Sequence, residues 1–265
     1  MLQKMIISRT LCASLILLVL GCGASENVQQ WQLPAEIDEL SGLAVGPDNT
    51  LYLHDDEIGA VYRFSLNTGE VSTVFHVEQP VIEGDFEGVA QTATHIFLIT
   101  SRGRLFRVQR EPNMTEAIVS ADVFDTGLSE LCEIEGLHAL DNHLYIACKK
   151  PYLKADKRKL LLIEYSLASH KVSREFRFDL ENIAAKKFNA SAIWLDSESI
   201  FLLSARQRTI IELSRAGELR REFKLDKIRH PQPEGLVLDK GRLIIADEGG
   251  GSGGRITTYH GWPNK

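Results

Sequence analysis

A short unit that recurs five times is the strongest constraint on how this chain can fold. Each copy has a polar residue, a spacer, Ser or Glu, a small residue and an apolar residue, and a turn and a second apolar run follow. The copies begin at intervals of roughly 43 to 56 residues, and a period in the forties built from short strands is typical of a β-propeller. They occupy residues 39–43, 85–89, 133–137, 189–193 and 232–236.

Apolar runs between the copies predict four antiparallel strands in each of the first four blades. In the second blade the outermost strand is expected at 115–124, and a short helical turn is expected at 180–187. The fifth blade has three strands of its own, at 235–238, 242–246 and 255–260. The alternating segment 28–33 is a natural partner for its open edge. We therefore predict an all-β, five-bladed β-propeller whose last blade is closed by the N-terminal strand.

The first residues are expected to direct export. Lys4 and Arg9 precede an apolar run at 10–20, which ends in Val19-Leu20-Gly21-Cys22. This tetrad resembles a bacterial lipobox, in which the cysteine is lipidated after cleavage. It predicts a lipoprotein signal peptide at 1–21, a lipidated tether at 22–27 and a propeller domain at 28–265. An uncleaved anchor and an ordinary secretory signal remain alternatives.

Export predicts the compartment of the protein and the redox conditions that its cysteines meet. The protein is expected in the bacterial cell envelope, facing the periplasm or the surface, and Gly23 after the cysteine favours the outer membrane where the host has one. An exported chain meets an oxidising compartment. The turn at Asp141 and Asn142 places Glu135 opposite Cys148, with Cys132 just before that strand. Cys132 and Cys148 can therefore form a disulfide or stay as two free thiols.

The net charge of the protein limits the classes of molecule that it is expected to bind. The formal net charge is −6, and removal of the signal peptide leaves 28 − 36 = −8. An acidic surface argues against nucleic-acid binding. We expect a monomer.

Two rings of side chains are expected at one mouth of the channel, because the first strand of each propeller blade lines the axis. The inner ring is Ser41, Glu87, Glu135, Ser191 and Glu234. The second, two residues earlier on each strand, is Glu39, Asp85, Glu133, Asn189 and Gln232.

Carboxylates occupy six of these ten positions. Two charges about 4 Å apart repel by roughly 4 kcal/mol at an effective dielectric near 20, so either protonation or a cation is needed. A hard, oxygen-only set favours calcium over zinc. The alternative is a water-filled mouth whose Glu side chains bind amides of neighbouring blades. The candidate ligands are Glu87, Glu135, Glu234, Ser41, Asp85, Glu133 and Glu39.

Charged residues after the second strand of each blade are expected on the rim of the same mouth. They suit a small polar ligand, a polysaccharide or a partner protein, and equally plain exposure to solvent. The basic loop at 149–159 could meet an anionic lipid or polysaccharide, or simply be solvated. No sequence pattern identifies catalytic residues. The rim candidates are Asp55, Asp56, Arg102, Lys149, Arg206, Asp247 and Glu248.

The repeated units also resemble a known family. The motifs Glu39-Leu-Ser-Gly-Leu-Ala, Asp85-Phe-Glu-Gly-Val-Ala, Glu133-Ile-Glu-Gly-Leu and Pro233-Glu-Gly-Leu-Val-Leu are similar to those of the SdiA-regulated (YjiK-like) family, related to NHL-repeat propellers. The resemblance covers about residues 33–260. It implies an exported five-bladed propeller with a bound calcium ion and no established biochemical role. The fourth unit departs, because Asn189-Ala-Ser-Ala replaces the acidic pair and glycine.

Two functions are consistent with these features. The first is a lipid-anchored, calcium-binding propeller that acts as a binding or scaffold module at the cell envelope. The second is a metal-dependent hydrolase of the lactonase or phosphoesterase type, which would use an axial calcium to polarise an ester oxygen.

Overall fold

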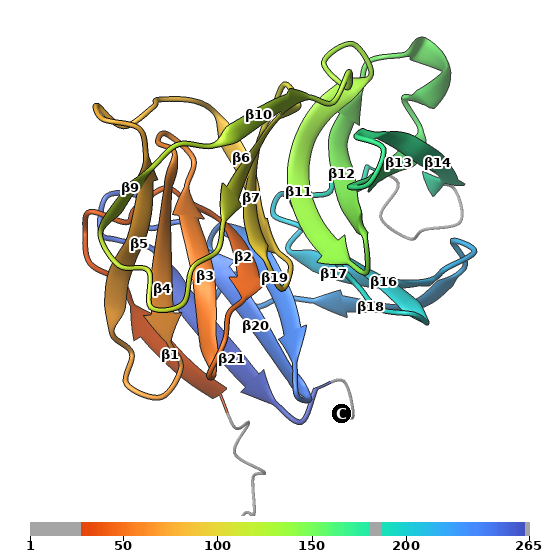
Figure 1. The fold of residues 1–265 in the computed structure, drawn as a ribbon. Helices are drawn as coiled ribbons and strands as arrows, with labels where there is room; N and C mark the ends of the chain where they lie inside the picture. Colours follow the sequence, from red (N-terminus) through yellow and green to blue (C-terminus); the bar gives the residue numbers. More distant parts are fainter. Residues whose placement is uncertain (1–27, 181–186, 263–265) are drawn as a thin grey trace, which may run out of the picture.

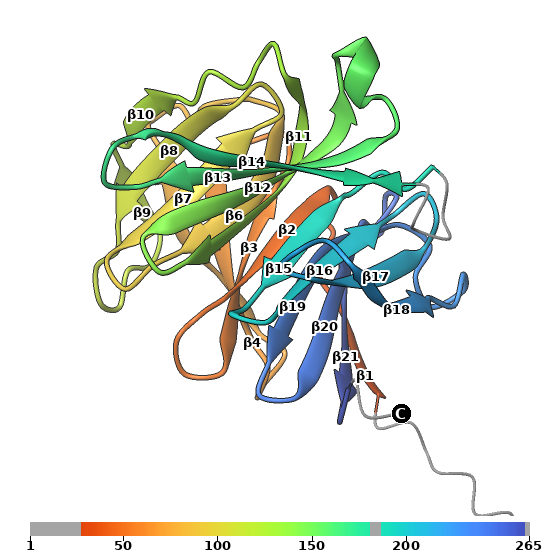
Figure 2. The same cartoon turned by 90° about the vertical axis from the view of Figure 1, so that its right-hand side faces the viewer.

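The protein is an all-β propeller of five antiparallel blades arranged around one axis (Figures 1 and 2). The computed structural model describes residues 28–180 and 187–262. The expected signal peptide at 1–21, the tether at 22–27 with Cys22, and most of the helical turn expected at 180–187 lie outside these residues. Among the described residues, no helix is both long and apolar enough to cross a membrane.

Each blade is a meander whose first strand is innermost. The first blade contains β2 (Leu40–Val45), β3 (Thr50–Asp55), β4 (Ala60–Ser65) and β5 (Val71–Val77). The second contains β6 (Phe86–Gln91), β7 (His95–Thr100), β8 (Arg104–Gln109) and β10 (Asp122–Asp125). The third contains β11 (Cys132–Leu140), β12 (His143–Pro151), β13 (Lys159–Ser166) and β14 (Lys171–Asp179), with a 3-10 helix, η1 (Lys154–Asp156), between β12 and β13. The fourth contains β15 (Ala192–Leu195), β16 (Ser199–Ser204), β17 (Thr209–Ser214) and β18 (Leu219–Lys224).

The N-terminal strand closes the ring, as predicted. The fifth blade is built from β19 (Pro233–Asp239), β20 (Arg242–Asp247) and β21 (Arg255–His260), and β1 (Val28–Gln32) pairs antiparallel with β21. Trp31 turns towards the first blade, where its ring meets Phe64 edge-on at 5.4 Å between centroids. The added strand therefore completes the fifth blade and also touches the first.

The prediction of a single outer strand at 115–124 in the second blade is wrong in detail. The chain forms two short strands there, and they belong to different blades (Figure 1). β9 (Ala117–Val119) pairs in parallel with β5 of the first blade, and β10 then pairs with β8 of the second. The segment thus ties the outer edges of two blades together, which a blade-by-blade assignment does not anticipate.

The core lies between the faces of neighbouring blades. One buried cluster, for example, combines Tyr52 and Phe75 of the first blade with Phe86 and Leu98 of the second. Blades pack very closely near the axis. A Cβ added to Gly88 in the second blade would lie 2.6 Å from Cβ of Leu137 in the third, so only glycine allows this approach.

Candidate functional site: the channel mouth

A β-bulge aims the inner-ring side chain of four blades at the axis. In the first blade, for example, Leu40 pairs with Asp55 and Gly42 pairs with His54, so the ladder skips Ser41. An extra residue of this kind bends the strand and redirects a side chain. The residues that the ladder skips are Ser41, Glu87, Glu135 and Glu234. The fourth blade begins its ladder at Ala192, directly after Ser191.

The structure brings the predicted inner ring together. Ser41, Glu87, Glu135, Ser191 and Glu234 surround an axial cavity of about 10 Å³, a volume on the scale of one water molecule. Ser41 donates a 3.4 Å hydrogen bond to Glu87. Ser191 is held by its own surroundings, since its hydroxyl accepts from the amide of Ala205 at 3.1 Å.

Burial and mutual repulsion make the three glutamates reluctant to ionise. Burial, with the nearby charges of Glu135 and Asp85, raises the pKa of Glu87 to about 9. Burial and the charge of Glu135 raise the pKa of Glu234 to about 8. Glu135 is only 4% exposed, and burial raises its pKa to about 7 against the opposing effect of Lys149. At neutral pH, and with no cation bound, these pKa values favour the protonated form of Glu87 and Glu234.

Lys149 supplies a built-in positive charge. Its Nζ donates to Glu135 and lies 3.7 Å from Glu133. Burial opposes the charge of this lysine, but the hydrogen bond and attraction to Glu135 prevail and raise its pKa. The sequence predicts Lys149 as a rim residue, whereas its long side chain reaches back to the axis. The positive charge of Lys149 reduces the repulsion among the axial carboxylates, as protonation or a bound metal ion would.

The second ring stands further out and makes its own contacts. Asp85 accepts from Ser101, and Gln232 donates to Glu248. Burial and nearby carboxylates, Glu39 among them, raise the pKa of Glu248 to about 7 and that of Asp56 to about 6. The second ring therefore adds further carboxylates that interact with one another across the mouth.

The predicted rim divides into three kinds of position. Asp56, Lys149 and Glu248 take part in the acidic mouth, while Arg102 and Arg206 are exposed. Asp55 is only 7% exposed, and its carboxylate accepts from the amide of Glu57 at 3.0 Å.

The prediction that Asp247 lies on the rim is wrong. It pairs with Pro233 inside the ladder, which buries its side chain completely. Its carboxylate lies 2.7 Å from Nδ1 of the buried His230, whose Nε2 lies 2.6 Å from the hydroxyl of Tyr259. This network fixes the segment before β19 to the fifth blade.

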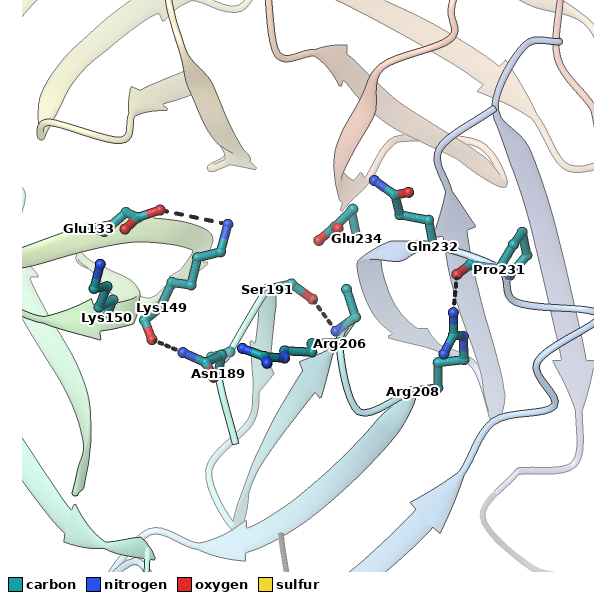
Figure 3. Close-up of a pocket in the computed structure, with 12 residues that line it drawn as sticks. Glu133, Lys149, Lys150, Asn189, Ser191, Arg206, Arg208, Pro231, Gln232 and Glu234 are labelled. Carbon is teal, nitrogen blue, oxygen red and sulfur yellow. Dashed lines mark hydrogen bonds and ion pairs between the residues drawn. The ribbon is translucent and has the colours of Figure 1, made fainter. Parts of the chain in front are cut away.

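A larger pocket opens beside the axis, over the fourth blade (Figure 3). Its volume is about 640 Å³, within the usual range for small-molecule sites. Lys149 and Glu133 stand on one side, Glu234 and Gln232 on the other, with Ser191 between them (Figure 3). Arg206, from the loop between β16 and β17, also lines the pocket.

Sequence reasoning missed Asp38. The glycine-rich segment 249–254 wraps around this carboxylate, which accepts from the amides of Gly251 at 2.6 Å and Gly253 at 2.7 Å. Successive glycine amides are a general anion-binding device, so the composition of the loop was a usable signal. The acceptor, Asp38, lies over 200 residues away in the sequence, and no sequence signal marked it as the partner of this loop.

The two body cysteines, for which bonded and free states were both open, form a disulfide. Cys132 and Cys148 are joined in the structure, with their Cα atoms 5.7 Å apart. The strand β11 starts at Cys132, and bulges around Ile134 shift its register. The bond braces the third blade at the base of the basic loop, beside Lys149.

Comparisons with known proteins show the fold alone. No protein-family model matches the chain, and no curated protein matches it by sequence. Among solved structures, glutaminyl cyclase of Myxococcus xanthus is similar at TM-score 0.60 and 12% identity, over 87% of this chain and 93% of that one. A luciferin-regenerating enzyme is similar at 0.57 and 11%, over 89% and 96%. The PQQ-bound aldose sugar dehydrogenase of Streptomyces coelicolor is similar at 0.54 and 10%, over 88% and 98%.

Proposed function

We propose that this protein is a binding module of the bacterial cell envelope, tethered by a lipid on Cys22, whose channel mouth binds calcium. The convergence of Glu87, Glu135 and Glu234 on one axial cavity carries the proposal. A nearby cation would favour the ionised form of all three. Within the described part of the chain, Lys149 alone forms an ion pair with any of them.

The donor chemistry of the site fits calcium, although the carboxylates do not stand ready around an ion. The cavity presents carboxylate and hydroxyl oxygens, with no thiol or imidazole among its lining residues, and such oxygens are calcium's preferred ligands. Among the described residues, no group of three or more acidic, His or Cys side chains forms a metal-binding cluster. Calcium would therefore compete with Lys149 for Glu135.

The residues that would hold the ion are Glu87, Glu135 and Glu234, with Ser41 as a weaker oxygen donor. Asp85, Glu133 and Glu39 would add negative charge from the second ring. When bound, calcium would supply the divalent positive charge that keeps these carboxylates ionised side by side. The protein's own role is to hold those oxygens on separate, rigid blades.

A thermal-melting experiment tests the calcium site. Calcium at about millimolar concentration should raise the melting temperature of the metal-stripped mature protein, because an ion that binds only the folded state stabilises it. Glu234→Gln should blunt this rise. Glu57→Gln, which changes an exposed acid of the same mouth, should leave it intact. Calcium-insensitive melting together with no heat of binding would overturn the calcium part of the proposal.

The placement of β1 indicates which way the mouth would face. β1 ends at Gln32, and the following segment packs at the mouth, where Gly249 donates to the carbonyl of Asp38 at 2.9 Å. Gln32 pairs with Arg255 near the mouth, whereas Val28, the first residue of β1, pairs with Tyr259 towards the other end of β21 and so lies away from the mouth. A six-residue tether spans at most about 20 Å. A lipid on Cys22 would thus hold the mouth away from the membrane.

Cell fractionation tests the anchor. Cys22→Ser should release the protein from the membrane fraction or leave an unprocessed precursor, because the modified thiol is absent. Cys12→Ser, in the apolar run of the signal, is the matched control and should be processed as usual. Normal processing and membrane retention of Cys22→Ser would contradict the anchor and leave the calcium test untouched.

A metal-dependent hydrolase of the lactonase or phosphoesterase type is the second candidate. It is favoured by carboxyl groups that exchange protons near neutral pH: the pKa of Glu234, which lines the large pocket, is raised by burial to about 8. A group with such a pKa suits general acid–base catalysis. Turnover of a lactone or phosphate ester that Glu234→Gln abolishes would favour the hydrolase over the binding module.

A further inference from the structure

The large pocket lies where the fourth repeat unit departs from the third. Its two ring positions are Asn189 and Ser191, where the third blade has Glu133 and Glu135. Both of these side chains are shorter than glutamate, and both line the cavity of about 640 Å³. The fourth blade therefore supplies no carboxylate for a metal at these two positions. Its side chains instead border a pocket that can hold a different ligand.

Three cations line this pocket without acidic partners among its described neighbours. Arg208 is held in place by two neutral carbonyls, those of His230 at 3.1 Å and Pro231 at 2.9 Å, so its charge is positioned but not neutralised. Arg206 and Lys150 are exposed, and neither forms an ion pair with any residue that the structure describes. Three such positive charges thus stand around one cavity on an otherwise acidic protein.

Hydrogen-bond acceptors line the same pocket. Glu133, with Lys149 beside it, presents a carboxylate from one side, and Glu234 presents a carboxylate and Gln232 an amide from the other. Asn189 uses its amide nitrogen to donate to the carbonyl of Lys149 at 2.9 Å, which leaves its side-chain oxygen as an acceptor. These groups accept hydrogen bonds from hydroxyls. The pocket therefore presents both cationic groups and hydrogen-bond acceptors to one ligand.

We propose that this pocket binds a small hydroxylated organic anion, such as a sugar acid or a sugar phosphate. The anionic group lies against Arg206 and Lys150, and the hydroxyls donate to Glu133 and Glu234. Arginine's planar fork matches both carboxylate and phosphate oxygens. The inference deepens the proposed binding module by naming the class of its ligand, and it requires no calcium.

Calorimetric titration of the mature protein tests the pocket in the presence of a chelator. The probes are glucuronate, glucose 6-phosphate and neutral glucose, all at low ionic strength because salt screens exposed charges. Glucuronate or glucose 6-phosphate should bind, with glucose at least about tenfold weaker. Whichever anion binds more tightly distinguishes a carboxylate from a phosphate ligand.

Two matched arginine variants locate the binding. Arg206→Gln should weaken the anion about tenfold or more. Arg102→Gln, at the corresponding loop of the second blade, should leave affinity unchanged. No binding of either anion, equal binding of glucose, or equal losses in the two variants would overturn the proposal. Because calcium is absent throughout, this result is independent of the melting test for the metal.

Discussion

Lys149 donates from its Nζ to the carboxylate of Glu135, and this pair joins the end of one strand to the bulge of its neighbour in the third blade. The two partners differ in exposure: the Lys149 side chain is 44% exposed and that of Glu135 only 4%. The lysine can therefore leave for solvent, whereas the carboxylate stays behind. This asymmetry makes Lys149 a candidate competitor for any cation that enters the mouth.

Lys149→Met should destabilise the metal-free protein and increase its response to calcium. Removing one partner leaves Glu135 buried without its counter-charge, and we expect a loss of about 1–3 kcal/mol because the pair is only partly buried. Calcium should then raise the melting temperature more than in the unmodified protein. The check is thermal melting with and without calcium.

Lys150→Met is the matched control, because this neighbouring lysine is exposed and has no ion-pair partner among the described residues. It should change stability by less than about 0.5 kcal/mol. If Lys149→Met left the calcium response unchanged, Lys149 would not compete with the ion.

Glu87→Gln should stabilise the metal-free protein at alkaline pH. Burial raises the pKa of Glu87 from 4.5 to about 9, so between these values the folded state binds more protons than the unfolded state. The free energy of unfolding contributed by this group therefore falls as pH rises through that range. Glutamine cannot ionise and avoids this loss, so the variant should melt several degrees higher at pH 8.

The pH dependence separates charge from packing. As the pH falls towards 5, the unfolded state of the unmodified protein approaches its pKa of 4.5 and begins to take up the proton that the folded state already holds, so the difference in stability between it and Glu87→Gln should shrink. Melting curves at pH 5, 6.5 and 8 in chelator provide the measurement. A difference that stayed constant with pH would show that the raised pKa is not the cause.

The ring architecture could be predicted from sequence because its signals are local and repeated. The five units share one pattern, and their turns fix the register of each following strand, so the repeat alone assigns Ser41 and Glu234 to the axis. The bulge that aims them is also repeated, immediately before a glycine in four blades. A feature that recurs in four of five blades leaves a repeated signal in the sequence.

Features that depend on a single long-range contact could not be predicted. Lys149 reaches the axis only because its side chain is long and the carboxylates attract it. Asp247 is the last residue of β20, where the ladder pairs it with Pro233 and its side chain is buried. β9 joins the first blade through a parallel pairing across the chain, where tertiary context overrides local strand propensity.

The disulfide should contribute about 2–4 kcal/mol to the free energy of unfolding. Cys132 and Cys148 are 16 residues apart, and closing a loop of this length restricts the unfolded chain. The double variant Cys132→Ala, Cys148→Ala should unfold at lower denaturant concentration. Reductant should lower the stability of the unmodified protein and leave the variant unaffected. Alkylation of the unreduced, denatured protein at either cysteine would contradict the bond.

Deleting residues 28–33 should lower the stability of the whole propeller cooperatively. The deletion removes β1, which leaves the edge of β21 unpaired and exposes Phe64 where Trp31 covered it. Trp31→Ala should remove the second effect alone and cost about 2 kcal/mol, less than for a fully buried tryptophan because this ring is partly exposed. Gln29→Ala, at an exposed position of the same strand, should change stability by less than about 0.5 kcal/mol. Denaturant unfolding measures all three variants, and a Trp31→Ala midpoint equal to that of Gln29→Ala would mean that the contact with the first blade does not stabilise the ring.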